Sequence, residues 1–393
     1  MNRKLSFLAV AISSCAAPIA FSQGLLSIGA SDEEFESMPF KTTVTGAIGY
    51  DSNMDSSSVN DDGSFYTQAG FLLSYATGNR TTSYSLGGTF NTTYYGSSAT
   101  TDDLFYNARL SFAIQHRASS QLTISDRAYI AYEFEPDYEI GASTSRRTDQ
   151  YLYAYNNLSA SYAWSRRVST VTGYTVSGIE YQESALKGEN RISNLFSQQI
   201  RYALSKVTTL TAEYRFGLTD YDNGFNDYVS HYFLLGADQS FSRNLSGSIR
   251  GGLEIREFDN RGSREAPYVE GALNQRIGDL TSARAYTRIG LDSNELGSYQ
   301  EHFAWRTGVT LNHRFTKDLV GNAGLHYIHS SYTDSPIAAD FDEDLISLSL
   351  GATYQFHKNL AVYASYYFTN TSSENSFREY DRHRLTLGVS ATF

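Results

Sequence analysis

The chain ends with the stretch RHRLTLGVSATF, residues 382–393, in which two kinds of side chain alternate. Leu385, Leu387 and Val389 fall on one parity together with the final residue, Phe393, and the intervening positions hold Arg, Thr, Gly and Ser. Successive side chains of a β-strand point to opposite faces. The pattern therefore predicts a terminal strand with one apolar and one polar face. Both an edge strand of a soluble sheet and a strand of a membrane barrel have this form, so the rest of the chain must distinguish them.

Residues 1–22 have the composition of an export signal. Arg3 and Lys4 precede a mostly apolar run that ends in small residues, which predicts cleavage before Gln23. A lipoprotein signal with a lipidated Cys15 is the alternative, and it is less favoured because the apolar run continues beyond that residue. Cleavage removes the single Cys of the chain, so we expect neither disulfides nor a Cys-ligated metal in the mature protein.

The composition favours one continuous domain made of sheet. A chain of 393 residues often contains two or three soluble domains, yet we find no linker, no compositional break and no second apolar run long enough for a membrane helix. Tyr is abundant, with 31 copies, and Pro is scarce, with five. Proline is excluded from strand interiors, so we expect Pro267 at the start of a strand. We assign residues 23–40 to a short periplasmic segment and residues 41–393 to the sheet domain.

Two kinds of connection take turns between the strand-like segments. The short and mostly basic ones lie at residues 78–80, 165–167, 205–206, 242–244, 316–318 and 357–359. The longer ones, rich in Asp, Ser, Gly and Asn, lie at residues 51–64, 96–103, 135–148, 220–226, 258–265, 292–298, 331–343 and 370–376. Outer-membrane barrels have short turns on the periplasmic side and long loops on the outside. The sequence therefore predicts an all-β fold, a transmembrane antiparallel up-and-down β-barrel.

A short unit recurs around the short turns. Residues 164–168, 241–245, 315–319 and 356–360 each read aromatic, small polar or His, basic, any residue, aliphatic. A repeat of this kind is also found in propeller blades, but a blade contains four strands and each period here holds only two long ones. An aromatic residue before each turn is typical of the girdle at a membrane interface.

Counting the alternating segments gives about 18 strands, with 16 as the next count. An even number places both ends of the barrel domain on one side of the membrane. Mid-strand charges fall on the polar parity, as expected when an Arg or Lys facing lipid at mid-depth costs about 2–4 kcal/mol. Asp126 and Gln198 break this rule, and we expect a bulge or a shifted register at each.

The segment GAIGYDSN at residues 46–53, the repeated turns and residues 385–393 resemble the β-barrel porin family of Gram-negative outer membranes. The resemblance covers nearly all of the mature chain. It implies a location in the outer membrane, contact with lipid and lipopolysaccharide, and insertion by the barrel assembly machinery. It also implies an assembly signal at the end of the chain. The residues of this signal are Leu385, Leu387, Val389 and Phe393.

The polar face of such a barrel surrounds a water-filled lumen. Its charged candidates are Glu213, Arg215, Arg250, Glu254, Arg256, Glu270, Arg276, Arg284, Arg288, Arg306 and Arg314. Eight of them are Arg and three are Glu, and Arg rings favour anions. One hypothesis is a basic stripe that guides anionic or sugar-like solutes. The other, which we favour, is a set of cross-strand pairs that brace the wall, each worth less than about 1 kcal/mol when solvated.

We find no recognisable catalytic, phosphate-binding or metal motif. We expect His116 and His357 in turns, and His326 and His329 have opposite parity, so they are not adjacent ligands on a straight strand. The acidic run at residues 340–344 resembles a calcium ligand set only in its composition, and a solvated loop is the favoured interpretation. We therefore expect no enzyme activity, no cofactor, no metal and no nucleic-acid partner.

The sequence thus predicts a porin-like barrel through which small hydrophilic solutes pass passively or with weak selectivity. A non-conducting barrel with a surface-binding or structural role is one alternative. An outer-membrane component of polysaccharide export is another, since some similar families have that association. The solute, any constriction by loops, and the oligomeric state are left open.

Overall fold

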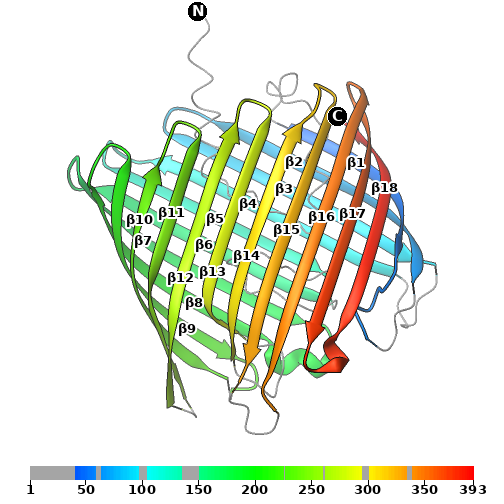
Figure 1. Ribbon diagram of the computed structural model, residues 1–393. Helices are drawn as coiled ribbons and strands as arrows, with labels where there is room; N and C mark the ends of the chain where they lie inside the picture. The colour runs from blue at the N-terminus through cyan, green and yellow to red at the C-terminus, as the bar shows by residue number, and fades with distance from the viewer. Residues whose placement is uncertain are drawn as a thin grey trace, which may run out of the picture.

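The structure is a computed structural model, and it describes residues 40–58, 63–96, 104–134, 150–224, 226–259, 262–293, 301–333 and 339–393. Eighteen strands and two short 3₁₀ helices, η1 (Ser184–Glu189) and η2 (Ser376–Arg378), form this part of the chain (Figure 1). The strands are β1 (Phe40–Asp51), β2 (Ser64–Gly78), β3 (Thr82–Tyr95), β4 (Leu104–Arg117), β5 (Leu122–Glu133), β6 (Tyr151–Ala163), β7 (Val168–Tyr181), β8 (Arg191–Ala203), β9 (Thr208–Tyr221), β10 (Tyr228–Ser240), β11 (Leu245–Phe258), β12 (Gly262–Ile277), β13 (Thr281–Ser293), β14 (Glu301–Arg314), β15 (Leu319–Tyr332), β16 (Phe341–His357), β17 (Leu360–Ser373) and β18 (Tyr380–Thr392). The predicted signal at residues 1–22 lies outside the described residues, as does the predicted segment at 23–40 apart from Phe40, which is the first residue of β1.

The sheet closes because the first strand pairs with the last. β1 pairs antiparallel with β2 and β18, and every other strand pairs with its two neighbours in sequence. Across the closure, the hydroxyls of Thr43 and Thr392 lie 2.9 Å apart. The backbone N–H of Phe393 donates to the carbonyl of Thr42 at 2.8 Å. The predicted barrel of 18 strands is confirmed, and the start of β1 and the chain end share one rim.

The two rims differ in the length of their connections. At the rim that holds Phe393, residues 79–81 suffice to join β2 to β3 and residues 358–359 to join β16 to β17. At the opposite rim, residues 134–150 connect β5 to β6. We call these the short-turn rim and the long-loop rim. The strands contain 12 to 17 residues, more than the 9–11 or so that a tilted strand needs to cross a bilayer, so their ends extend beyond the hydrocarbon.

Exposure follows the alternation seen in the sequence. On β18, Leu387 and Val389 are 51% and 57% exposed on the outer surface, whereas Thr386 on the inner surface is only 7% exposed. The same alternation of large exposed apolar side chains with smaller or polar inner ones recurs on the other strands. A water-soluble protein rarely leaves so much contiguous apolar surface uncovered. The outer surface is therefore the one that faces lipid.

Tyrosine rings cover glycines on the inner wall. A side chain at Gly49 would overlap the ring of Tyr66, and one at Gly388 would overlap the ring of Tyr363. The same holds for Tyr268 over Gly290 and Tyr286 over Gly308. Aromatic rings packed on glycine shield bare backbone and fix the local register of a sheet. This packing accounts for part of the high tyrosine content.

One predicted loop and one predicted strand start are wrong. β11 continues to Phe258 and β12 begins at Gly262, so the loop predicted at residues 258–265 is a tight connection. Pro267 therefore lies inside β12. β13 pairs with β12 only from Val269 onward, so on that side Pro267 does not need to donate a ladder hydrogen bond.

Both predicted turn histidines belong to strands instead. His116 lies in β4, where its Nδ1 is 2.8 Å from the hydroxyl of Thr82 on β3, and His357 is the last residue of β16. The bulges expected at Asp126 and Gln198 are also absent. The registers of β4, β5 and β6 pass through Asp126 without a shift, and those of β7, β8 and β9 pass through Gln198 in the same way. Both side chains therefore do lie on the lipid-facing surface.

No helix in the described ranges is long and apolar enough to cross a membrane.

Candidate functional site

The charged residues predicted to line the lumen all lie on the inner parity of β9 and β11 to β14. The outer parity of these strands carries exposed apolar residues such as Leu210, Ile249 and Val309. Five of the eight predicted arginines contact acidic side chains in the described part of the chain, either on the same strand or on strands up to three away. Two groups of contacts result, one near the middle of the wall and one at the long-loop rim.

The central cluster is built on two glutamates shared by two arginines. Arg215 donates from Nε to Glu213 at 2.6 Å and from Nη2 to Glu270 at 2.8 Å. Arg250 lies 3.4 Å from Glu213 and 3.5 Å from Glu270. The hydroxyl of Tyr268 donates to the second oxygen of Glu270 at 2.7 Å. Each carboxylate therefore has several donors, which fixes its position on the wall.

Asp238 extends the central cluster and was missed in the sequence. Its carboxylate accepts from Arg201 at 2.8 Å and from Arg250 at 3.4 Å. Gln199 donates to Glu213 at 2.8 Å beside them. Asp238 sits on the polar parity of β10, and that parity was the signal that would have identified it.

A second group, the rim cluster, is almost fully buried. Arg256 donates to Glu254 at 2.6 Å and to the carbonyl of Leu291 at 2.7 Å, and it lies 3.4 Å from Glu301. Its guanidinium carbon is 4.7 Å from the centre of the Tyr228 ring. Glu254 is 0% exposed and Arg256 is 3% exposed. A buried pair with this many partners holds the strands in place. Removal of one partner would leave the other charge buried and uncompensated, which is strongly destabilising.

One aspartate beside the rim cluster serves two arginines. Asp292 lies 2.9 Å from Arg288 and 2.6 Å from Arg306. Asp292 was predicted to lie in a loop, so the carboxylate that Arg288 and Arg306 share was not expected. Together with Arg256, Glu254 and Glu301 of the rim cluster, these residues make three arginines and three carboxylates.

Two predicted residues lack such a partner. Arg276 near the end of β12 and Arg284 near the start of β13 lie toward the short-turn rim. Within the part of the chain that the structure describes, neither makes an ion pair with an acidic side chain. Pairs thus occupy the centre and the long-loop rim, and unpaired positive charge lies near the short-turn rim.

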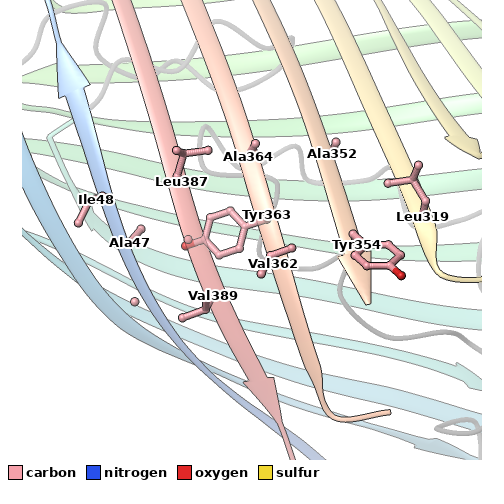
Figure 2. Close-up of a pocket in the computed structure, with 12 residues that line it drawn as sticks. Ala47, Ile48, Leu319, Ala352, Tyr354, Val362, Tyr363, Ala364, Leu387 and Val389 are labelled. Atoms are coloured by element: carbon pink, nitrogen blue, oxygen red, sulfur yellow. The ribbon is translucent and has the colours of Figure 1, made fainter. Parts of the chain in front are cut away.

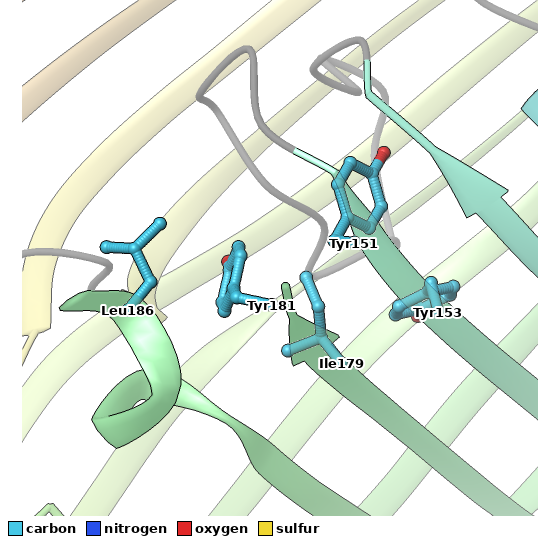
Figure 3. Packing of buried hydrophobic residues seen from close by; sticks show 5 residues of the cluster. All are labelled: Tyr151, Tyr153, Ile179, Tyr181 and Leu186. Carbon is cyan, nitrogen blue, oxygen red and sulfur yellow. The ribbon is translucent and has the colours of Figure 1, made fainter. Parts of the chain in front are cut away.

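The adjoining wall at β6 and β7 is aromatic near the long-loop rim. Tyr151 and Tyr153 of β6, Ile179 and Tyr181 of β7, and Leu186 of η1 form one buried cluster, with η1 bringing Leu186 against the strand ends (Figure 3). Two other inner side chains at this rim, Tyr95 of β3 and Tyr332 of β15, are equally covered. The inner surface is therefore tightly packed at the long-loop rim.

A hollow of about 600 Å³ lies beside the closure of the barrel (Figure 2). Most of its lining belongs to the outer parity, including Ile48 of β1, Val362 of β17 and Leu387 of β18. Small residues such as Ala352 and Ala364 create the depression between these larger side chains. The lining contains no charge, so the hollow is part of the lipid-facing surface and not of the lumen.

The acidic side chains of residues 340–344 do not lie together, because alternation along β16 points them to opposite faces of the sheet. Glu343 faces inward, where Arg378 binds both its oxygens. Asp344 faces outward and accepts from Tyr327 at 2.7 Å, with His329 at 2.8 Å. His326, on the opposite parity from His329, contacts the hydroxyl of Tyr286. Among the described residues, no group of three or more His, Cys, Asp or Glu side chains is placed to hold a metal ion.

Comparison with known proteins places this geometry in a family. A family model with the description "Putative beta-barrel porin 2" matches residues 38–393. No curated protein matches the chain. Similar solved structures include OccAB4 of Acinetobacter baumannii, with 12% identity over 90% of this chain and 98% of that one and a TM-score of 0.47. OpdK of Pseudomonas aeruginosa with vanillate has 14% identity, 90% and 98% coverage and a TM-score of 0.44. A BenF-like porin from Pseudomonas fluorescens has 13% identity, 91% and 99% coverage and a TM-score of 0.49.

Proposed function

Because the chain belongs to the family described as "Putative beta-barrel porin 2" and is an outer-membrane barrel, we propose that small hydrophilic solutes pass through its lumen with a weak preference for anions. The observation that carries this proposal is the charged inner wall of β8 to β14. The rim cluster, the central cluster, and Arg276 with Arg284 follow one another from the long-loop rim to the short-turn rim. A polar path of this kind replaces part of the hydration shell of a passing solute.

The pairing within the wall explains why the preference is weak. Arg201, Arg215 and Arg250 are neutralised by Glu213, Glu270 and Asp238, so the central cluster adds little net charge to the lumen. The remaining positive charge comes from Arg276 and Arg284 near the short-turn rim. Rings of arginine attract anions, and a partly neutralised wall attracts them only modestly.

Ion selectivity in planar lipid bilayers tests this proposal. The variant Arg276→Ala/Arg284→Ala removes two inner charges near the short-turn rim, and we expect its reversal potential in a salt gradient to move toward cation preference. The matched control is Lys206→Ala/Lys317→Ala, which removes the same charge from exposed turns at the same rim. An unchanged reversal potential in the first variant contradicts the proposed role of these arginines.

A second candidate function is a barrel that does not conduct and works through its outer surface. The tight packing of Tyr151, Tyr181 and Leu186 at the long-loop rim favours it. The same bilayer experiment separates the two functions. Discrete conductance steps from the wild-type protein support a porin, and their absence, with correctly folded protein inserted, supports the second candidate.

We also propose that the end of β18 is read during assembly. Leu385, Leu387, Val389 and Phe393 project from the outer surface and are 48% to 65% exposed. A row of apolar side chains ending in an aromatic carboxy-terminus is available to the barrel assembly machinery before the barrel closes. In the finished protein the same row contacts lipid, and lipopolysaccharide is the proposed neighbour at the long-loop rim.

A further inference from the structure

Four polar side chains interrupt the lipid-facing surface of β5 to β8. We call them the polar face, and they are Asp126, Asn156, Thr172 and Gln198. Counted from Leu122, Ala163, Val168 and Ala203, they lie four to seven residues from the short-turn end of their strands. A tilted strand rises about 2.5 Å per residue, so they lie roughly 10–18 Å from the short-turn rim, within the span of an apolar band about 25 Å tall.

Contacts within the polar face satisfy only part of its hydrogen-bonding capacity. Asn156 donates its amide N–H to one oxygen of Asp126 at 2.8 Å, and Thr172 donates to the amide oxygen of Gln198 at 2.8 Å. The second oxygen of Asp126, the amide oxygen of Asn156 and the N–H groups of Gln198 have no partner among the described residues. Hydrocarbon offers none either, and unsatisfied polar groups in a bilayer are strongly disfavoured.

The polar face is unlike the rest of the barrel surface. No other outward side chain that lies four or more residues from both ends of a described strand carries a charge or an amide. Small residues lie beside two of the four, with Ala128 next to Asp126 on β5 and Ala154 next to Asn156 on β6. Polar side chains flanked by small residues are typical of surfaces where membrane-spanning elements pack closely against protein.

We propose that the polar face docks a second copy of this chain, with β5–β6 of one copy against β7–β8 of the next. β5–β6 presents the acceptors, the free oxygens of Asp126 and Asn156, and β7–β8 presents the donor, the amide of Gln198. Copies of a barrel insert in one orientation, so rotation about the membrane normal brings side chains of equal depth together. An interface between two different surfaces closes into a ring under such rotation.

Removal of the polar face tests the association. In mild detergent we expect the wild-type protein to have the mass of two or more chains by light scattering, and Asp126→Leu/Asn156→Leu/Gln198→Leu to have the mass of one. The control is Thr287→Leu/Thr307→Leu, which alters outward threonines on β13 and β14 and keeps the wild-type mass. Heat-dependent gel mobility verifies that each variant is folded. A folded triple variant that retains the wild-type multimeric mass overturns the proposal.

Disulfide trapping in membranes decides the case where detergent separates the copies or the triple variant does not fold. In a Cys15→Ser background, Asp126→Cys and Gln198→Cys chains with different tags are produced together. Each chain then carries a single Cys, so any disulfide must join two chains. We expect a crosslink between the two kinds of chain. Crosslinks only between like chains, or none above the level of Thr307→Cys, overturn the proposal.

Discussion

Arg382 of β18 forms a salt bridge with Asp51 of β1 across the closure of the barrel. Its Nη2 lies 2.6 Å from one carboxylate oxygen and its Nε lies 3.0 Å from the other. Asp51 is 0% exposed, and it also accepts from the hydroxyl of Tyr95 and the backbone N–H of Asn53. The pair therefore fastens the last strand to the first at the long-loop rim.

Loss of this pair should weaken the barrel strongly. Asp51→Ala leaves Arg382 buried without its counter-charge, and breaking a buried pair in this way typically lowers the free energy of unfolding by about 3–5 kcal/mol. The matched control is Asp318→Ala, whose partner Lys317 is 90% exposed and 3.9 Å away. An exposed pair is worth about 0–1 kcal/mol. Urea unfolding in detergent micelles measures both, and equal losses contradict the assigned role.

Adjacent glycines in β11 should respond oppositely to the same substitution. A side chain at Gly252 would collide with the backbone carbonyl of Phe233, which cannot move without disturbing β10. Gly251 faces lipid, and a methyl group there meets its neighbours at ordinary contact distance. We expect Gly252→Ala to destabilise the barrel by about 1–3 kcal/mol, and Gly251→Ala to be neutral or slightly stabilising. Urea midpoints for the two variants give the comparison, and similar midpoints would refute it.

Removing one acid from the central cluster should strengthen the preference for anions. Glu270 is within 2.8 Å of Arg215 and 3.5 Å of Arg250, and Glu270→Gln keeps a similar shape while leaving more of their charge uncompensated. We expect the anion-to-cation permeability ratio to rise. Glu257→Gln, on the outer parity of β11, is the control with the same charge change. A ratio that stays constant, or falls, would show that solutes do not pass along this wall.

Deletion of Phe393 should separate assembly from stability. Its side chain is 65% exposed and packs little in the finished barrel, and deletion removes only two backbone hydrogen bonds with Thr42, so the purified chain should still refold into micelles. In cells, we expect less of the deleted protein to reach the outer membrane than of Phe393→Tyr, which keeps the aromatic end. Equal amounts in the membrane contradict an assembly signal, and failed refolding in micelles assigns the residue to stability instead.

Alternation of side chains was sufficient to predict the strands, because it depends only on residues within one strand. It placed the faces of β9, β11 and β18 correctly. The prediction failed around Pro267, because the exclusion of proline from strand interiors was given more weight than the alternation of side chains. Whether a strand tolerates proline there depends on where β13 begins to pair with β12, which is at Val269. The register between strands is set by contacts between residues distant in sequence. Alternation therefore predicted that Arg215 lies on the inner face, but it could not predict that Glu270 is its partner.

The same limit explains the partners that the sequence analysis missed. Asp238 meets Arg250, and Asp292 meets Arg306, from the neighbouring strand, and Asp292 had been assigned to a loop. By contrast, Asp126 and Gln198 were noticed because they broke a local pattern. Neither position has the expected bulge or shifted register. The two side chains instead face lipid and belong to the polar face.

The contact between Thr43 and Thr392 spans 349 positions of the chain. The ribosome therefore completes the final strand long after the first strand, with which it pairs, has been synthesised. Until then the first strand keeps an open ladder of backbone donors and acceptors, the kind of edge that captures other strands. In a product truncated anywhere within the sheet, the edge of β1 would stay unpaired. Only the full-length chain can pair this edge and so remove a site of aggregation.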